Sequence, residues 1–126
     1  MSNAQRWIGR TMSGIAVLFL LVDAAGKLMK LAPVVEGTAQ LGYPESSIVP
    51  LGVLLLVCVL LYVVPRTAVW GVIFLTGFLG GAVATHVRVG NPLLTHTLFP
   101  TYVAALLWGG LALRDPRLRA LLTHRE

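Results

Sequence analysis

The sequence predicts an all-α membrane protein in which four helices cross the bilayer as a bundle. Hydrophobic residues make up 56% of the 126 residues and charged residues only 12%, whereas soluble domains carry about 25% charged residues. The apolar residues gather into four long stretches, and nearly all of the charge lies outside them. Because a chain of this length cannot bury so much apolar surface in a soluble core, we expect one domain whose solvent is lipid.

The expected spans cover residues 7–30, 47–64, 67–86 and 97–113. Each approaches the roughly 20 apolar residues that cross a bilayer as a helix, and a helix is required because backbone groups in lipid must be hydrogen-bonded within their own segment. The first stretch is basic and then apolar, as in a signal peptide, but its apolar part is long and no small-residue cleavage site follows it. We therefore expect a retained first span.

The connection between the first two spans carries helix signals of its own. Pro33 suits a first helical turn, Glu36 favours a position near a helix N-terminus, and Gly42 and Pro44 stop the element. These residues predict a short helix near the membrane interface, closed by a Tyr-Pro turn at Tyr43.

The other two connections are shorter turns. Pro65 ends the second span and Thr67 is positioned to cap the third, so the two spans form an antiparallel hairpin. An Asn-Pro turn at residues 91–92 precedes the fourth span, where Thr95 or Thr97 is expected as the cap. Pro100 then falls in the first helical turn, where proline is tolerated.

The basic residues predict the orientation of the bundle. If four helices cross the bilayer, seven arginines lie on the same side as the termini, and only three basic residues lie on the other side. The positive-inside rule then places both termini and the 65–66 turn in the cytoplasm. The larger group comprises Arg6, Arg10, Arg66, Arg114, Arg117, Arg119 and Arg125, and the smaller group comprises Lys27, Lys30 and Arg88.

Two further features are typical of the inner membrane interface. The tail, residues 114–126, is basic and partly amphipathic, so we expect it to lie on the inner headgroups. Trp7, Trp70 and Trp108 are expected to form an aromatic belt at the same side. The net charge of +5 does not indicate a nucleic-acid partner, because the basic residues form no patch with interleaved aromatic residues.

Small residues repeat along the third span. Gly77, Gly81 and Thr85 follow a four-residue spacing, with Gly80 and Ala84 beside them. Such spacing lets two helix backbones approach closely. We therefore interpret Gly77, Gly80, Gly81 and Ala84 as helix-packing positions.

One acidic residue, Asp23, interrupts an apolar stretch, and Lys27 follows it by one helical turn. Asp23 lies about 10 Å deeper than Lys30 at a rise of 1.5 Å per residue, and its short side chain cannot reach the interface. Charges within membrane helices are costly and often functional. The alternative is a purely structural pairing of Asp23 with Lys27 or Arg88.

Several polar residues of the third and fourth spans fall at the same outer end as Asp23. Thr85, His86 and Arg88 end the third span, and His96 and Tyr102 begin the fourth. We expect these residues to form a ligand or charge cluster with Asp23 and Lys27, although His86 and His96 also fit an ordinary interfacial role. A metal is not expected, because zinc normally takes three or four ligands with tighter spacing. Asp23, His86 and His96 would form a metal site only if the fold brought them together.

Three segments resemble the bacterial DoxX-like family of small four-helix membrane proteins. They are LVDAAGKLMKLAPVVEGTAQLGYPESS at residues 21–47, FLTGFLGGAVATHVRVGNPLLTHTLFPTYVAALLWGG at residues 74–110, and ALRDPRLRALL at residues 112–122. The block GGAVATHVRVG with its following proline and histidine is the specific part. The positions that match the polar pattern of the family are Asp23, Lys27, Tyr43, Thr85, His86, Arg88 and His96.

The resemblance implies a four-helix bundle in the bacterial inner membrane. The wider group is associated with membrane oxidoreductase assemblies, including a quinone-linked thiosulfate oxidation subunit, and distant animal relatives act as chaperones for membrane receptors. Because Cys58 is the single cysteine, a dithiol reaction within this chain is excluded.

These observations lead to one functional hypothesis and two alternatives. The leading hypothesis is an accessory subunit of a membrane oxidoreductase assembly, with a quinone or small-anion site at the outer end and redox proteins as partners. Lys27 and Arg88 would hold the ligand, His86 or His96 would relay a proton, and Asp23 would orient the cations. The alternatives are a scaffold that packs its Gly77 and Gly81 face against partner helices, or a small transporter subunit. Assembly of this chain into a homo-oligomer is also compatible with the sequence.

Overall fold

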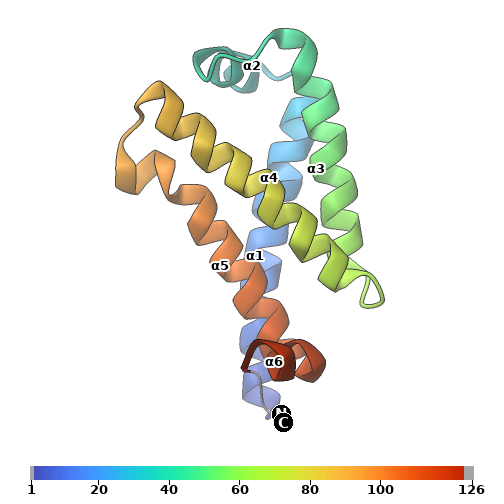
Figure 1. The fold of residues 1–126 in the computed structure, drawn as a ribbon. Helices are drawn as coiled ribbons and strands as arrows, with labels where there is room; N and C mark the ends of the chain where they lie inside the picture. Colours follow the sequence, from blue (N-terminus) through green and yellow to red (C-terminus); the bar gives the residue numbers. More distant parts are fainter. Residues whose placement is uncertain (1, 124–126) are drawn as a thin grey trace.

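The computed structural model describes residues 2–123, and every regular element within that range is helical (Figure 1). Four segments are long and apolar enough to cross a membrane, which confirms the predicted all-helical, four-span architecture. The long helices are α1 (Asn3–Leu28), α3 (Ile48–Val63), α4 (Ala68–Val89) and α5 (Phe99–Arg114). The shorter elements are α2 (Ala32–Gln40), the 3-10 turn η1 (Glu45–Ser47), the π-helical turn η2 (Leu93–Thr97) and α6 (Pro116–Thr123).

The four long helices form a ring in which each packs against two neighbours. Both α1 and α4 pack against α3 and α5, and α4 crosses the bundle obliquely in front of α1 (Figure 1). The short elements α2, η1 and η2 lie at one end, which we call the α2 end. The start of α1, the α3–α4 turn and α6 lie at the other, which we call the terminal end (Figure 1).

The core of the bundle is apolar, and so is most of its outer surface. Leu20, Leu55, Leu75 and Leu107 are at most 1% exposed. On the outside, large side chains such as Leu18 (65%) and Leu60 (52%) remain exposed. In water such a surface would be unfavourable, whereas in a bilayer it faces lipid.

The closest contacts between helices involve glycines at the terminal end. They do not involve the glycines that were predicted as packing positions on α4. A Cβ atom on Gly9 of α1 would lie 2.7 Å from the carbonyl oxygen of Gly110 on α5, and one on Gly71 would meet the backbone of Tyr62. By contrast, a Cβ atom on Gly77, Gly80 or Gly81 would meet no described atom within 4 Å. Gly77, Gly80 and Gly81 therefore pack against no described helix. Their packing against another chain stays a prediction.

A buried hydrogen-bond chain joins three helices close to these glycines. The hydroxyl of Tyr62 on α3 donates to the Leu107 carbonyl of α5 at 2.7 Å, and the Ser13 hydroxyl of α1 donates to the Tyr62 oxygen at 2.8 Å. Tyr62 is only 2% exposed. Hydroxyl groups within a membrane bundle need such partners, because hydrocarbon offers none.

The helix starts differ from the predicted caps. Ser2 and Gln5 form a reciprocal capping box, so α1 begins at Asn3, before the predicted Trp7. Thr67 occupies the N-cap position of α4, but its hydroxyl donates to the Leu61 carbonyl at 2.7 Å and thus completes the preceding helix.

Neither predicted threonine caps α5. Thr97 donates to the Asn91 carbonyl at 3.2 Å, and Thr95 lies 2.8 Å from His96 Nδ1. The reason is that the π-helical turn η2 runs directly into α5, so Leu98 takes the N-cap position. Pro100 falls in the first turn of α5, as expected.

The predicted short helix between the first two spans is α2, with Pro33 in its first turn. Glu36 lies in its second turn rather than its first. Gly42 follows α2 with a φ of +87°, a backbone conformation that favours glycine. This bend turns the chain toward Tyr43 and Pro44, which precede η1 and α3.

The tail forms α6, which lies across the terminal end (Figure 1). Leu118 is buried in the core, while Leu121 and Leu122 are exposed. Arg125 of the predicted cytoplasmic group lies outside the described residues. Of the three tryptophans, Trp7 and Trp70 are exposed, and the Trp108 indole donates to the Thr76 hydroxyl at 2.7 Å, which joins α5 to α4.

Candidate functional site

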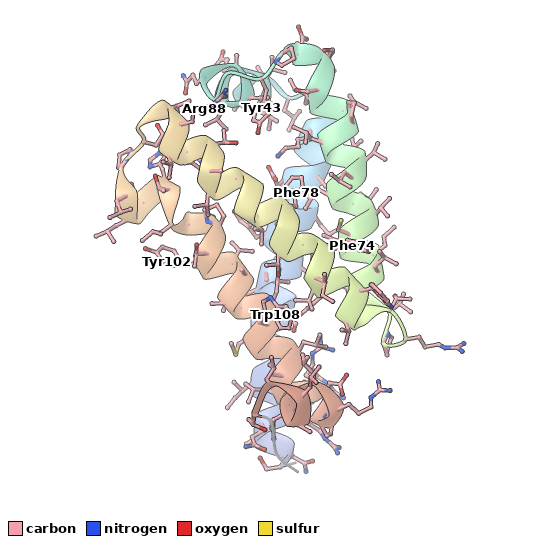
Figure 2. The ribbon with its side chains drawn as sticks, in the orientation of Figure 1. Tyr43, Phe74, Phe78, Arg88, Tyr102 and Trp108 are labelled. Atoms are coloured by element: carbon pink, nitrogen blue, oxygen red, sulfur yellow. The ribbon has the colours of Figure 1, made fainter. Side chains whose placement is uncertain are left out.

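A cavity of about 440 Å³ lies between the long helices near the α2 end. Most of its walls are apolar and come from all four long helices, with Phe19, Leu54, Phe78 and Val103 as examples. Figure 2 shows Phe78 on α4 in the middle of the bundle, where that helix crosses α1. The polar side chains that line the cavity are Asp23, Lys27, Thr38, Tyr43, Thr85 and His86.

Asp23 and Lys27 form an ion pair on α1. Lys27 Nζ lies 2.7 Å from Asp23 Oδ2, and the two side chains are 14% and 33% exposed, respectively. Gly52 on α3 makes room for the stem of Lys27, because a Cβ atom there would lie 2.9 Å from Lys27 Cβ. The i, i+4 spacing on the helix brings the charges together, and close packing with α3 holds the lysine in place.

A second cavity, of about 400 Å³, adjoins the first and opens toward α2 and η2. Asp23, Lys27 and His86 line both cavities. Asn91 and His96 line only the second. The ion pair and one histidine therefore lie where a mainly apolar space meets a more polar one.

The end of α4 positions His86. Gly90, with a φ of +74°, closes the helix: its N–H bonds to the Val87 carbonyl, and the Asn91 N–H bonds to the His86 carbonyl. This Schellman arrangement folds the Asn91 side chain back, so that its Nδ2 lies 2.7 Å from His86 Nδ1. With the amide donating, the proton of a neutral His86 ring is assigned to Nε2.

His86 and His96 contact each other edge-to-face. Their ring centroids lie 6.1 Å apart, and the rings are inclined at 73°. His96 Nδ1 is also within 2.8 Å of the Thr95 hydroxyl. Within residues 2–123, no group of three or more His, Cys, Asp or Glu side chains is arranged to hold a metal ion.

The loop after α2 roofs the first cavity and is held by α4. Thr85 donates its hydroxyl proton to the Gly81 carbonyl at 2.8 Å, so the Tyr43 hydroxyl, 2.7 Å from Thr85 Oγ1, is the donor in that pair. Arg88 Nη2 donates to the Leu41 carbonyl at 2.9 Å. Figure 2 shows Tyr43 and Arg88 together where the loop meets α4.

Not all of the predicted site residues meet. Asp23, Lys27, Thr85 and His86 line the first cavity, and His96 lines the second, but Arg88 and Tyr102 line neither. Tyr102 is 45% exposed and donates to the Leu94 carbonyl at 2.9 Å on the outer side of α5 (Figure 2). Among the four predicted packing positions, Gly77 and Gly81 line the first cavity, whereas Gly80 and Ala84 do not.

Some site residues had little or no signal in the sequence. Asn91 was predicted only as part of a turn, and Thr38 has no distinguishing spacing. The sequence predicts a Tyr-Pro turn at Tyr43, but nothing in the spacing indicates the partner of its hydroxyl group. The aromatic wall residues Phe19 and Phe78 resemble any other apolar residue of a span.

The family comparison covers nearly all of this bundle. The model of the DoxX-like family matches residues 11–110. The chain belongs to the DoxX-like family. No curated protein and no solved structure matches it. The matched range of this DoxX-like protein runs from α1 to α5 and includes every lining residue of the two cavities.

The arrangement in this DoxX-like protein suits an amphipathic ligand. Its apolar walls favour burial of a hydrocarbon ring or chain. The Lys27 ammonium has three N–H donors, of which one bonds to Asp23. No hydrogen bond to His86 Nε2 is made within residues 2–123. The polar end therefore offers donors to an acceptor atom on a ligand.

Proposed function

We propose that this DoxX-like protein is an accessory membrane subunit of an oxidoreductase assembly and that its first cavity holds the head group of a quinone. The observation that carries this proposal is the mainly apolar cavity of about 440 Å³ with an ion pair and a histidine at one end. Small-molecule sites typically have a volume of about 300–1,000 Å³, apolar walls and a few well-placed polar groups.

The residues at the polar end fit a quinone better than a small anion. Lys27 is already paired with Asp23, so little net positive charge remains to stabilise a buried anion. A carbonyl oxygen needs only hydrogen-bond donors, which Lys27 Nζ and His86 Nε2 supply. When bound, a quinone would supply exchange of electrons and protons. The chain would bind and orient it and would exclude water.

Arg88, which the sequence predicts as a ligand-binding residue, is given a different role in this proposal. Its guanidinium bonds to the Leu41 carbonyl and lines neither cavity, so we assign ligand binding to Lys27 and His86. Arg88 instead positions the loop that roofs the cavity. His96, which lines the second cavity, is the group that would exchange protons between His86 and the α2 end.

Binding of decylubiquinone to purified protein, followed by tryptophan fluorescence, tests the site. We expect one equivalent to bind, and we expect His86→Ala and the double variant Asp23→Asn/Lys27→Gln each to weaken binding at least about tenfold, the loss of one strong hydrogen bond. Tyr102→Phe is the matched control, because Tyr102 lies outside both cavities. Absence of binding, or equal binding by all variants, would contradict the proposed site.

A scaffold role is the second candidate, and Gly80 favours it. Gly80 lines neither cavity, and a Cβ atom there would meet no described atom within 4 Å. Exposed glycine lets a partner helix approach closely. If the scaffold role holds, Gly80→Leu abolishes co-purification of a membrane partner but leaves decylubiquinone binding intact. Gly81→Leu, which also fills the cavity, affects both.

We also propose that the protein resides in the bacterial inner membrane with both termini in the cytoplasm. Arg6, Arg10 and Arg66 lie at the terminal end of the bundle, together with the arginines of α5 and α6. Such an excess of arginine supports a cytoplasmic location for that end.

A further inference from the structure

A third cavity, of about 200 Å³, lies at the terminal end, far along the bundle from the proposed quinone site. Two arginines line it, Arg10 from α1 and Arg114 from the end of α5. Neither arginine lines the proposed quinone site, so the two sites are independent of each other.

The Arg114 guanidinium is held in place without an anionic partner. Its carbon Cζ lies 5.7 Å from the centre of the Tyr62 ring, a cation–π contact. Its Nε is buried and has no hydrogen-bond partner among the described residues. A buried donor without an acceptor is costly, so within the described residues the hydrogen-bonding capacity of this guanidinium is not used, although its side chain lines the cavity.

The charge of this cavity is uncompensated within residues 2–123. Neither Arg10 nor Arg114 takes part in any of the ion pairs there. The nearest acid in sequence, Asp115, is engaged by Arg117: its Oδ1 accepts from the Arg117 backbone at 2.9 Å and lies 3.5 Å from Arg117 Nε. Two arginine side chains therefore line one small cavity, and Arg10, which is exposed, also lies over Trp7 with its Cζ 5.3 Å from the ring centre.

The remaining walls indicate a lipid rather than a soluble anion. Gly14 and Val17 on α1 continue from Arg10 along one helix face toward the membrane interior. A Cβ atom on Gly14 would meet no atom of the described residues within 4 Å, so an open apolar strip runs from the arginines into the span. The hydroxyl groups of Ser13 and Tyr62 are already satisfied.

We infer that this cavity binds the phosphodiester group of an anionic phospholipid. The two guanidinium groups would hold the phosphate, because their planar N–H forks match its oxygens. The acyl chains would lie along Gly14 and Val17. Basic pockets between membrane helices are suited to anionic headgroups. Arg10, near the start of α1, and Arg114, at the end of α5, are placed where the span meets the headgroups.

Native mass spectrometry of the purified full chain tests this inference. The protein is mixed with phosphatidylglycerol or phosphatidylcholine of the same acyl chains, and retained lipid is counted. We expect one phosphatidylglycerol to be retained in preference to phosphatidylcholine. The double variant Arg10→Gln/Arg114→Gln should bind phosphatidylglycerol at least about 30-fold more weakly, as the loss of two charged hydrogen-bond donors predicts.

The control is Arg6→Gln/Arg66→Gln, which removes the same charge from exposed positions at the same end. It should leave lipid retention within about threefold of the parent, because neither of these arginines lines the cavity and exposed charges interact only weakly in water. Equal losses in both double variants, or equal retention of the two lipids by the parent protein, would overturn the inference. So would displacement of phosphatidylglycerol by millimolar inorganic phosphate, which would identify a soluble anion as the ligand.

If the double variant does not fold, Arg114→Lys replaces it. This variant keeps the charge but loses the planar fork, and we expect about fivefold weaker retention of phosphatidylglycerol. Unchanged retention would contradict the assigned role of the guanidinium.

Discussion

The hydroxyl of Tyr43 lies 2.7 Å from the hydroxyl of Thr85, although the two residues are 42 positions apart in the chain. This contact joins the loop after α2 to α4 at the point where the loop covers the first cavity. Arg88 adds a second link from α4 to the Leu41 carbonyl of the same loop. The roof of the proposed ligand site is therefore held by the helix that also carries His86.

Tyr43→Phe is expected to lower the free energy of unfolding by about 1 kcal/mol, because it removes one hydrogen bond between the loop and α4. Thermal unfolding in detergent, followed by circular dichroism, measures the change. A double-mutant cycle with Thr85→Val isolates the pair. Strictly additive effects of the two substitutions would show that the hydroxyl groups do not interact.

Removal of one partner of the ion pair on α1 should cost more than removal of both. Asp23→Asn leaves the Lys27 ammonium, which is 14% exposed, without its counter-charge, and we expect a loss of about 2 kcal/mol in stability. Asp23→Asn/Lys27→Gln should recover at least half of that loss. A double variant less stable than both single variants would mean that the pair itself stabilises the bundle.

Alanine substitutions at glycines should have opposite effects at the two kinds of position. Gly9→Ala places a methyl group against the Gly110 carbonyl, so the helices must separate, at a cost of about 1–3 kcal/mol. Gly80→Ala meets no described atom and should stabilise the helix by up to about 1 kcal/mol. Melting temperatures of both variants provide the comparison, and a strongly destabilised Gly80→Ala would imply that another chain packs there.

Tyr62→Phe is expected to destabilise the bundle by about 1–2 kcal/mol. The substitution leaves the Ser13 hydroxyl and the Leu107 carbonyl without their shared partner in a buried position. Unfolding in mixed micelles gives the difference. Tyr102→Phe, which removes an exposed hydrogen bond, serves as the comparison and should change stability by less than about 0.5 kcal/mol.

The proposed orientation is tested with single cysteines in a Cys58→Ser background. Glu36 on α2 and Thr123 on α6 are exposed at opposite ends of the bundle. In intact cells, a membrane-impermeant maleimide should label Glu36→Cys but should reach Thr123→Cys only after permeabilisation, because the arginine-rich end stays inside. The reverse labelling pattern would contradict the proposed topology.

The ion pair and the glycines differ in how well spacing predicts them. Asp23 and Lys27 are one turn apart on one helix, so their contact follows from helix geometry alone. The contact between Gly9 and Gly110 joins the two ends of the chain and depends on how α1 and α5 cross. The regularly spaced Gly77 and Gly81 line the first cavity, because small residues permit close approach without supplying a neighbouring helix, and their packing against another chain stays a prediction.

The contacts of Arg88 and Tyr102 likewise could not be predicted from residue spacing. Both fall at the α2 end, as the sequence predicts, but the direction of each side chain depends on the neighbouring turn. Arg88 bonds to the loop that Gly42 bends toward it, and Tyr102 bonds to the carbonyl of Leu94 in the π-helical turn. Neither turn geometry can be derived from residue types alone.

Hydropathy, helical spacing and local motifs act over a few neighbouring residues, so they were enough to predict the four membrane helices, the short helix after the first span, the Asp23–Lys27 pair and the family. The three-dimensional arrangement of the helices was needed to show which glycines pack, which polar residues line the cavities, and that Arg10 and Arg114 line the same cavity. Those outcomes depend on helix crossing angles and loop paths, which are set by the packing of side chains far apart in the chain.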